Sequence, residues 1–400
     1  MNAFVPLETS IFAPDFTLDP YPWLEDLYYR DDVLGFSSEG MNFCFRYQDC
    51  RDLISAHKNV SREPPDTSDS DMAAFAEKYP ARAWGFQYLL TDMKAKAILA
   101  RFIQEMLNRI SLEQFKSVFQ SFEKPGVHSE YLRDLSHLPM KSIMQAWGFR
   151  YDDKLIDDHY EYSVALVKSF DNYGEDSLMA AGDAGMAENI RYCREQFNSA
   201  EPGTLLHDFA REIRASGIED DYGVGCLVSL VQSTPNTLSI SNTLMLRNML
   251  RYRDKVSVLR EDPSLVCADV ITEFLRRDNH VKALARQVHD DFKLRGSALR
   301  RGDSLYIFYP GVNLDPTHWD NPLELSFDRQ FTHDNHNIFG GSRYSCIGSR
   351  IALKYFSELV PLILEYLPVT AEVSSEDIRV EGDWITERVI TNLPILVPEH

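Results

Sequence analysis

The sequence predicts several helices, together with short strand-like runs near the N-terminus. Residues 93–122 place apolar side chains such as Ile98 and Phe102 at near-helical spacing, as one face of a helix does. A second periodic run covers residues 351–367, directly after a glycine-containing loop. Between residues 17 and 60, by contrast, short helical runs alternate with strand-like runs.

The first half of the chain alternates predicted helices, a strand and a loop. Residues 22–29 are expected to be helical and residues 43–46 to form a strand. Residues 61–71 are polar and contain adjacent prolines, so they are predicted to be a loop. Residues 129–216 are expected to hold several further helices, and they carry no motif for catalysis.

A long helix is predicted over residues 222–252. Three carboxylates, Glu219 to Asp221, stand at its start, where the positive end of the helix dipole stabilises them, although a solvated charge run would look the same. Pro235 lies inside this helix, where it removes one backbone hydrogen bond and favours a kink. We therefore expect a helix that bends near its middle.

The composition indicates a soluble protein of the cytosol. No apolar run approaches the ~18 residues that span a bilayer, and residues 1–16 lack the features of a secretion signal. Six cysteines are scattered without a C-x-x-C pair, which argues against zinc ribbons and against a secreted disulfide framework. The net charge of −20 disfavours binding to nucleic acid or anionic membranes. We expect a cytoplasmic location and no membrane anchor.

Cys346 lies in the most informative segment of the chain. Gly340 and Gly341 form a tight turn ahead of it, Gly348 follows it, and the periodic run at 351–367 begins soon after. A cysteine at a helix N-terminus is favoured as a thiolate, because backbone N–H groups and the helix dipole stabilise its charge. A thiolate held in this way suits an axial iron ligand. Taken alone, the Cys-Ile-Gly triplet would indicate only an ordinary loop cysteine.

This segment resembles the haem-binding loop of the cytochrome P450 superfamily, whose pattern is close to F-G-x-G-x-[H/R]-x-C-x-G. The residues that match the pattern are Phe339, Gly340, Cys346 and Gly348. Two positions depart from it, because Ser342 replaces the second glycine and Tyr344 replaces the usual His or Arg. The other motifs of the family are therefore needed to support the resemblance.

Those motifs occur in the family's order. Glu273 to Arg276 is similar to its E-x-x-R motif and lies 73 residues before Cys346, although such pairs are also common on helix surfaces. Residues 313–316 are similar to the family's N-R-D-P stretch, and Arg329 belongs to a stretch similar to its F-x-x-x-R region. The resemblance implies that these charged residues form a buried network that locks the core.

The resemblance also implies a fold, a cofactor and its ligands. The fold is mainly α with a small β lobe, the cytochrome P450 fold, formed by residues 1–400 as one domain. The cofactor is haem b (iron protoporphyrin IX), with Cys346 as the iron ligand and Phe339 among the cofactor-binding residues. Arg286, thirteen residues after Glu273, is implied as a partner of a haem propionate, since an arginine fork suits a carboxylate.

The rest of the expected propionate-binding set departs from the family's D-x-x-x-H-x-x-x-R form. Asp92 is followed by Lys96 and Ala100, and Arg101 comes one place late. Lys96 can still pair with a propionate as a point charge, and Tyr344 can donate a hydrogen bond to one.

The resemblance places the oxygen-activating segment at residues 233–237, counted back from the Asp-Pro pair at 262–263. Thr237 then matches the family's catalytic alcohol, and Asn236 stands where most relatives have an acid. A carboxylic acid can relay protons, whereas an amide does not titrate and can only orient water. The alternative is that Pro235 only bends a core helix and that Asn236 and Thr237 are satisfied polar residues.

The resemblance implies a soluble, bacterial-type monooxygenase that inserts oxygen into a small organic molecule, such as a natural product. Electrons are expected from a separate ferredoxin or flavodoxin-type protein, because no flavin or iron–sulfur motif is visible. Basic residues near the loop would receive that acidic partner, although an ordinary mixture of surface charges explains them equally well. They are Lys94, Lys96, Arg343, Arg350 and Lys354.

Two other functions stay open. Asn236 in place of an acid also suits peroxide-driven chemistry, or coupling, dehydration or rearrangement without oxygen insertion. A noncatalytic haem-binding protein is the remaining alternative, and the intact Cys346, Glu273 and Arg276 weigh against it.

Overall fold

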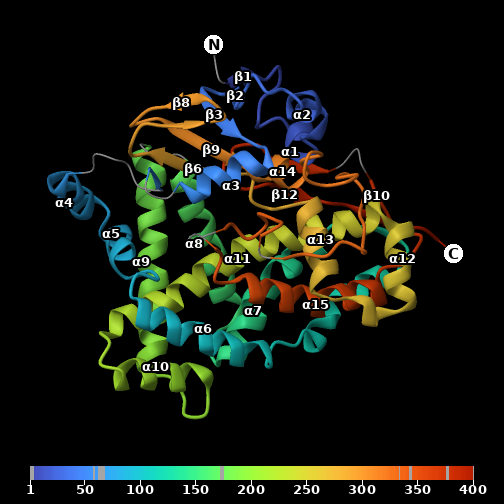
Figure 1. The fold of residues 1–400 in the computed structure, drawn as a ribbon. Coiled ribbons are helices and arrows are strands. Elements are labelled where there is room, and N and C mark those ends of the chain that lie inside the picture. Colours follow the sequence, from blue (N-terminus) through green and yellow to red (C-terminus); the bar gives the residue numbers. More distant parts are fainter. Residues whose placement is uncertain are drawn as a thin grey trace.

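A computed structural model shows a helical body with a smaller, sheet-rich lobe beside it (Figure 1). The strands of the lobe lie at the top of the view in Figure 1, and most helices lie below them. This arrangement confirms the predicted mainly α fold with a small β lobe. The structure describes residues 4–56, 59–61, 68–171, 175–332, 334–341, 345–374 and 378–399.

The main sheet brings together strands from distant parts of the chain. Its strands, in spatial order, are β1 (Phe4–Pro6), β2 (Gly35–Ser38), β3 (Met41–Cys44), β9 (Ser304–Phe308), β6 (Ala283–Val288) and β4 (Val60–Ser61). β1 pairs with β2 and β3 pairs with β9 in parallel, and the other neighbours are antiparallel. Phe36 stacks on Phe43 with ring centroids 4.9 Å apart, and Phe308 packs edge-on against Phe36.

Smaller sheets flank the helical body. They are formed by β10 (Glu372–Val373), β13 (Ile395–Val397) and β5 (Gly126–His128), by the hairpin β11 (Arg379–Glu381) and β12 (Val389–Asn392), and by the hairpin β7 (Phe292–Leu294) and β8 (Ser297–Leu299). The β11–β12 hairpin turns over residues 382–388, and this turn carries a carboxyl group that contacts the central helix of the body.

The described chain also contains α-helices and two 3-10 helices. The first group is α1 (Pro14–Leu18), α2 (Tyr21–Tyr28), α3 (Tyr47–Ser55), α4 (Asp69–Lys78), α5 (Pro80–Tyr88), α6 (Met93–Leu107) and α7 (Tyr131–Trp147). The second group is α8 (Asp153–Asp171), α9 (Asp176–Asn198), α10 (Leu205–Ala215), α11 (Asp220–Arg251), α12 (Arg253–Glu261), α13 (Ala268–Arg277), α14 (Tyr309–Asn313) and α15 (Ser349–Tyr366). Short 3-10 helices are η1 (Glu113–Glu123) and η2 (Pro263–Leu265).

α11 is the long central helix, and it confirms the helix predicted over residues 222–252. The carboxylates predicted at its N-terminus occupy the N-cap and the first turn. Most of its side chains are buried, so its polar residues must find partners inside the protein. Asn242, for example, donates hydrogen bonds to the carbonyl oxygen of Leu135 and to the hydroxyl of Tyr355.

One predicted helix is shorter than expected. The apolar spacing over residues 93–122 predicts a single helix, but α6 ends at Leu107 and η1 begins only at Glu113. Asn108, a poor helix former, is the C-cap residue, whereas Ile110 beyond it is still buried. The apolar pattern therefore continues to mark residues that face the core after the helix itself has stopped.

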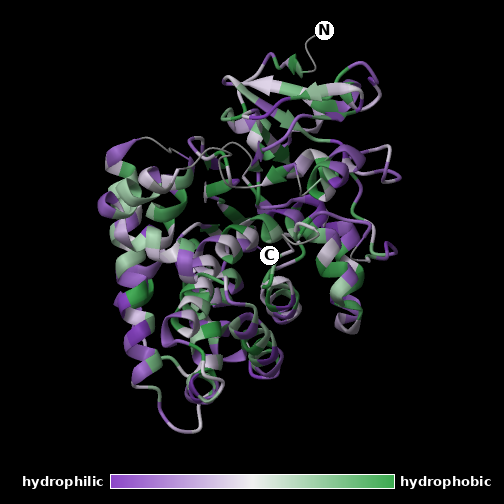
Figure 2. Cartoon of the chain, turned by 60° about the vertical axis from the view of Figure 1, so that its left-hand side comes forward, coloured by the Kyte–Doolittle hydropathy of each residue, from purple (hydrophilic) through white to green (hydrophobic). Residues whose placement is uncertain are grey.

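The apolar sides of the helices share one large core. Buried apolar residues of α6, α7, α11, α13 and α15 form a single cluster, in which Phe102 of α6 packs against Trp147 at the end of α7. Figure 2 shows hydrophobic and hydrophilic residues on opposite sides of several helices, as expected for helices that cover a core. This core holds α11 and α15 in fixed positions relative to the other helices.

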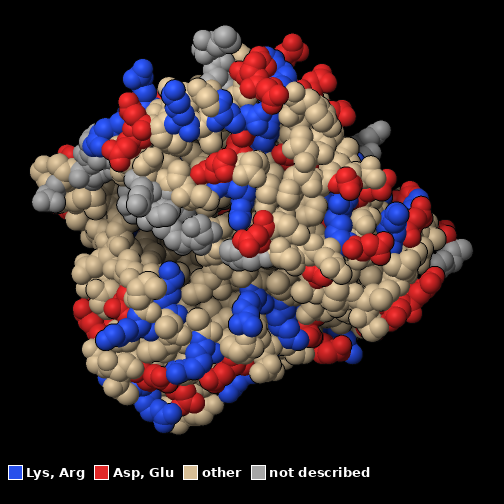
Figure 3. All heavy atoms as spheres, in the orientation of Figure 1, with Lys and Arg blue, Asp and Glu red and all other residues tan. Residues whose placement is uncertain are grey.

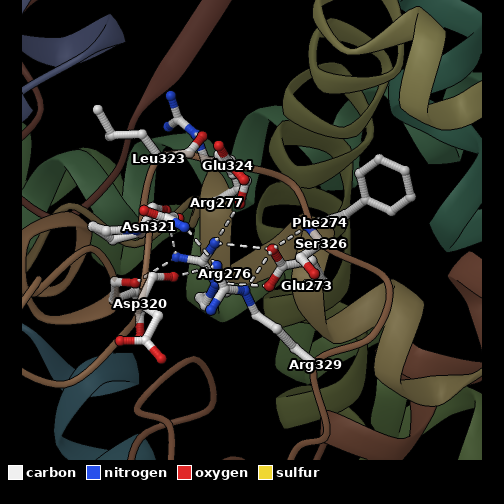
Figure 4. Close-up of polar contacts among 12 residues, drawn as sticks. Glu273, Phe274, Arg276, Arg277, Asp320, Asn321, Leu323, Glu324, Ser326 and Arg329 are labelled. Carbon is white, nitrogen blue, oxygen red and sulfur yellow. Dashed lines mark hydrogen bonds and ion pairs between the residues drawn. The ribbon is translucent and has the colours of Figure 1, made fainter.

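A buried charge network joins α13 to the segment that follows α14 (Figure 4). Arg276 donates hydrogen bonds to both carboxylate oxygens of Glu273, at 2.7 and 2.9 Å, and both side chains are fully buried. Arg329 donates to the same carboxylate at 3.2 Å, which confirms the predicted network. The other hydrogen bonds of Arg276 go to the backbone carbonyl oxygens of Asn313, Pro322 and Glu324.

Replacing Glu273 with alanine is expected to lower the free energy of unfolding by about 3–5 kcal/mol, because it leaves two arginines without their buried counter-charge. Urea unfolding followed by circular dichroism measures this loss. Glu324→Ala is the matched control, since only the backbone of Glu324 contacts Arg276 and its side chain is exposed. Equal stabilities of the two variants would contradict the structural role of Glu273.

Candidate functional site

The Cys346 loop is closed by backbone hydrogen bonds. The N–H of Cys346 donates to the carbonyl oxygen of Phe339 at 2.9 Å, and the N–H of Ser349 donates to the carbonyl oxygen of Cys346 at 3.3 Å. Gly340 has a φ angle of 73°, a left-handed conformation that glycine adopts without steric cost. α15 begins at Ser349, so the helix start predicted after the loop is confirmed.

The position of Cys346 fits an iron-binding thiolate. Its side chain is exposed, and it precedes an 18-residue helix whose N-cap, Gly348, offers no side-chain hydrogen-bond acceptor. N–H groups at such a helix start, together with the helix dipole, favour a negative charge. An exposed sulfur in a loop closed by hydrogen bonds would suit a thiolate ligand of haem iron.

The other cysteines differ from Cys346 in their surroundings. Cys44, Cys50 and Cys193 are buried, and burial raises the pKa of each thiol well above its usual range. Burial also raises the pKa of Cys226 to about 12. Cys267, by contrast, is exposed at the N-cap of α13.

The predicted propionate-binding residues lie on separate elements. Arg286 lies on β6, is almost fully buried, and donates a hydrogen bond to the carbonyl oxygen of Ala285 at 2.7 Å. Lys96 is half-buried on α6, and Phe339 is half-buried in the cysteine loop. Tyr344 lies outside the described residues.

The residues around Lys96 explain part of the departure from the family's pattern. Asp92 is the N-cap residue of α6. Its carboxylate accepts hydrogen bonds from the N–H groups of Lys94 and Ala95 and so caps the helix. Arg101 pairs with Glu212 of α10 at the surface. Of these two groups only Arg101 could bind a propionate, and its guanidinium is already paired with Glu212.

Asn236 and Thr237 lie in the middle of α11, directly after Pro235. The hydroxyl of Thr237 is half-buried and donates to the carbonyl oxygen of Ser233 at 2.8 Å. Its hydrogen is therefore committed to the helix, while its lone pairs can still accept a hydrogen bond. One turn later, the hydroxyl of Ser241 donates to the carbonyl oxygen of Thr237 at 2.8 Å.

Asn236 has a partner that no motif in the sequence indicates. Its Nδ2 donates a hydrogen bond of 2.6 Å to Oε2 of Glu387, in the turn of the β11–β12 hairpin. Asn236 is 2% exposed and Glu387 is 6% exposed. The two residues are 151 positions apart in the sequence, and the residues around Glu387 show no recognisable pattern, so sequence reasoning missed this contact.

The surroundings of Glu387 favour its neutral form. Burial and the negative charge of Asp171 raise the pKa of Glu387 to about 8, although the hydrogen bond from Asn236 acts in the opposite direction. Burial also raises the pKa of Asp171, even though backbone N–H groups of the hairpin turn donate to it. Nearby, burial lowers the pKa of His280 to about 4, so this imidazole is neutral at pH 7.

Basic and acidic side chains are mixed on the face of the protein shown in Figure 3. Of the basic residues proposed to receive an electron donor, Lys94 and Arg350 are exposed, and Lys354 forms an ion pair with Glu358 on α15. Arg343 lies outside the described residues. None of the described helices is both long and apolar enough to cross a membrane.

Glu387→Gln is expected to change how stability depends on pH. The folded protein keeps the Glu387 proton up to about pH 8, whereas the unfolded chain releases it near 4.5, so wild-type stability falls across this window as pH rises. Compared with Glu387→Gln, the wild type is expected to lose about 1.4 kcal/mol of unfolding free energy per pH unit in this window. Urea unfolding at several pH values measures the difference. If the free energy of unfolding depends on pH in the same way in the wild type and in Glu387→Gln, the pKa assignment is contradicted.

Known proteins resemble this chain in sequence. A family model for Cytochrome P450 matches residues 266–385, which include α13 and the Cys346 loop. Steroid C26-monooxygenase of Mycobacterium tuberculosis is 29% identical over 258 residues, covering 62% of this chain and 67% of that protein. Biotin biosynthesis cytochrome P450 of Bacillus subtilis is 25% identical over 213 residues, covering 52% and 53%. The matches thus span about half to two thirds of these relatives.

Solved structures resemble it over nearly its whole length. The cytochrome P450 PksS of the Bacillus subtilis bacillaene polyketide synthase has a TM-score of 0.76 and 18% identity, and the match covers 98% of this chain and 100% of that one. Epothilone B-bound cytochrome P450epoK has a TM-score of 0.75 and 16% identity, with the same coverage. At these identities the likeness shows the shared fold.

Proposed function

Because this chain belongs to the cytochrome P450 superfamily, as a bacterial-type member, we propose that it binds haem b through Cys346 and oxygenates a small organic molecule. The observation that carries the proposal is the Cys346 loop, with its exposed sulfur at the start of α15. Arg286, Lys96 and Tyr344 would hold the propionates, and Phe339 would lie beside the haem in the same loop. In this proposal, residues 1–400 form one domain.

The haem, when bound, supplies the oxidising chemistry, and the thiolate increases electron density at its iron. The protein contributes binding, orientation and proton supply. Thr237 can accept a hydrogen bond at Oγ1 and so orient water beside it, because its own hydrogen is bound to the carbonyl oxygen of Ser233. Asn236 can orient but cannot titrate, so protons must come from another group.

The substrate class in this proposal is a natural-product scaffold. A relative named for biotin biosynthesis, and structures of a polyketide-synthase and an epothilone-bound cytochrome P450, support it. Electrons would come from a separate ferredoxin or flavodoxin-type protein. A second candidate function is peroxide-driven or non-oxygenating chemistry, and the observation that favours it is the amide of Asn236 in place of an acid.

The ferrous carbon monoxide complex of the purified protein should absorb at the wavelength from which the family takes its name. Cys346→Ser is expected to abolish this band, because an alcohol does not provide the thiolate ligand. Cys267→Ser is the matched control. Cys267 is also exposed and also stands at the start of a helix, α13, but it lies outside the Cys346 loop and should leave the band unchanged. A band typical of histidine-ligated haem in the folded wild type would contradict the proposal.

Thr237→Ala should uncouple the enzyme, so that reducing equivalents appear as hydrogen peroxide instead of product. The expected reason is the loss of the polar group at Oγ1 that orients water in this part of α11. Coupling is measured as product formed per reductant consumed. Thr243→Ala is the control, because the Thr243 hydroxyl also contacts the carbonyl oxygen four residues back but is buried. Equal coupling in both variants would exclude a role for Thr237 in oxygen chemistry.

Turnover with NAD(P)H is expected to require an added ferredoxin or flavodoxin system. It should also slow with salt, because exposed charges are screened within ~10 Å at about 0.1 M. Product formation with and without the added proteins, over a range of salt concentrations, measures both effects. Full activity of the chain with NADPH alone would refute the need for a separate donor.

A further inference from the structure

The turn of the β11–β12 hairpin is fixed against the segment that follows α13. The N–H of Lys282 donates to the carbonyl oxygen of Thr386 at 2.7 Å, and the N–H of Arg388 donates to that of His280 at 2.9 Å. Between these bonds, Glu387 forms a β-bridge with Val281. Residues 386–388 are therefore held in an extended conformation beside residues 280–282.

The extended backbone determines where Glu387 points. Successive side chains of an extended segment point to opposite sides. The hydroxyl of Thr386 donates to Asp171 at 3.1 Å, and the guanidinium of Arg388 binds the carbonyl oxygen of Thr17 and the carboxylate of Asp278. Glu387, between them, reaches α11 instead.

On α11, Glu387 contacts Asn236, the residue that stands where the family has an acid. Asn236 donates from Nδ2, and Glu387 accepts at Oε2 over 2.6 Å, with both side chains buried. An amide at this position can donate to a carboxyl group in either protonation state, whereas an acid there would place two carboxyl groups against each other. The substitution in α11 and the carboxyl group in the hairpin therefore complement each other.

We propose that Glu387 is the titratable partner of the Asn236–Thr237 segment, a positioning residue that acts through Asn236 and gives oxygen activation its pH dependence. This inference rests on the proposed function. In its neutral form, Glu387 accepts from Asn236 at Oε2 and carries its hydrogen on Oε1. When that proton passes to water, the hydrogen bond from Asn236 becomes charge-assisted and stronger. Asn236 itself transfers no proton.

The charged and titratable groups around Glu387 are consistent with this role. Asp171 and Tyr160, both on α8, interact electrostatically with Glu387, and burial and the charge of Glu387 are among the causes that raise the pKa of Tyr160 to about 12. His280 and Lys282 belong to the bridged segment, and burial lowers the pKa of Lys282 to about 7. With a pKa of about 8, Glu387 changes charge close to neutrality.

Lys282 and the neighbouring Arg388 have other partners. The ammonium group of Lys282 donates to the carbonyl oxygens of Ile11 and Trp384, at 3.1 and 2.7 Å. Arg388 binds backbone carbonyl oxygens and Asp278. The proton on Glu387 is therefore retained mainly because of burial and the nearby charge of Asp171.

Infrared difference spectra of the haem-loaded protein test the inference directly. The wild type should show a protonated carboxyl band that disappears with a midpoint near pH 8. Glu387→Gln, which keeps an oxygen acceptor for Asn236, should lack this band. Glu381→Gln is the matched control, because Glu381 lies on the same hairpin but pairs with Lys168 at 2.6 Å and is one-third exposed. It should leave the band unchanged.

Two further variants should move the midpoint in opposite directions. Asn236→Ala removes a hydrogen bond that favours the charged form, so the midpoint should rise. Asp171→Asn removes a negative neighbour, so the midpoint should fall. The pH profile of product formed per reductant consumed should follow the infrared midpoint in each variant and should lose its inflection in Glu387→Gln.

A wild-type protein without a carboxyl band that titrates near neutrality would overturn the inference. An unchanged pH profile of coupling in Glu387→Gln would overturn it as well. Failure of the proposed function is distinguishable, because it appears in the ferrous carbon monoxide spectrum of the wild type, which does not depend on Glu387. If the wild type shows the expected carbon monoxide spectrum and Glu387→Gln keeps the pH profile of coupling, only the proposed role of Glu387 is rejected.

Discussion

The buried contact between Glu273 and Arg276 is the interaction on which the rest of the site depends. Arg276 fixes α13 to the backbone after α14, and Arg329 donates to the same Glu273 carboxylate. Charges that are fully buried are tolerated only with complete partners, and Arg276 uses its Nε, Nη1 and Nη2 atoms in hydrogen bonds. The same helix leads into residues 280–282, against which the hairpin turn is bonded. α13 thus carries the buried charge network and leads into the segment that holds the hairpin turn.

Local patterns made much of this predictable from the sequence. The glycines before Cys346 and the periodic run after it predict a loop and a helix, and the structure contains both. The spacing of Glu273 and Arg276 predicts a pair on one helix, and the structure buries it. These features depend on residues within a few positions of one another, or on motifs that the family shares.

Other features could not be predicted, because they depend on distant segments. Apolar periodicity identifies buried positions. Because Ile110, between α6 and η1, is also buried, the pattern did not reveal that the helix ends there. The partner of Asn236 is 151 residues away and becomes visible only when the hairpin turn is placed against α11. Once this contact is known, the amide at position 236 is no longer an isolated departure from the family's pattern. A titratable carboxyl group is present, and it comes from another element.

The central claim is that the sulfur of Cys346 is bound to haem iron. X-ray absorption at the iron edge of the ferric protein measures the first coordination shell directly. The account predicts a sulfur neighbour of iron that is present in the wild type and absent in Cys346→Ser. A wild-type first shell composed only of nitrogen and oxygen would contradict it.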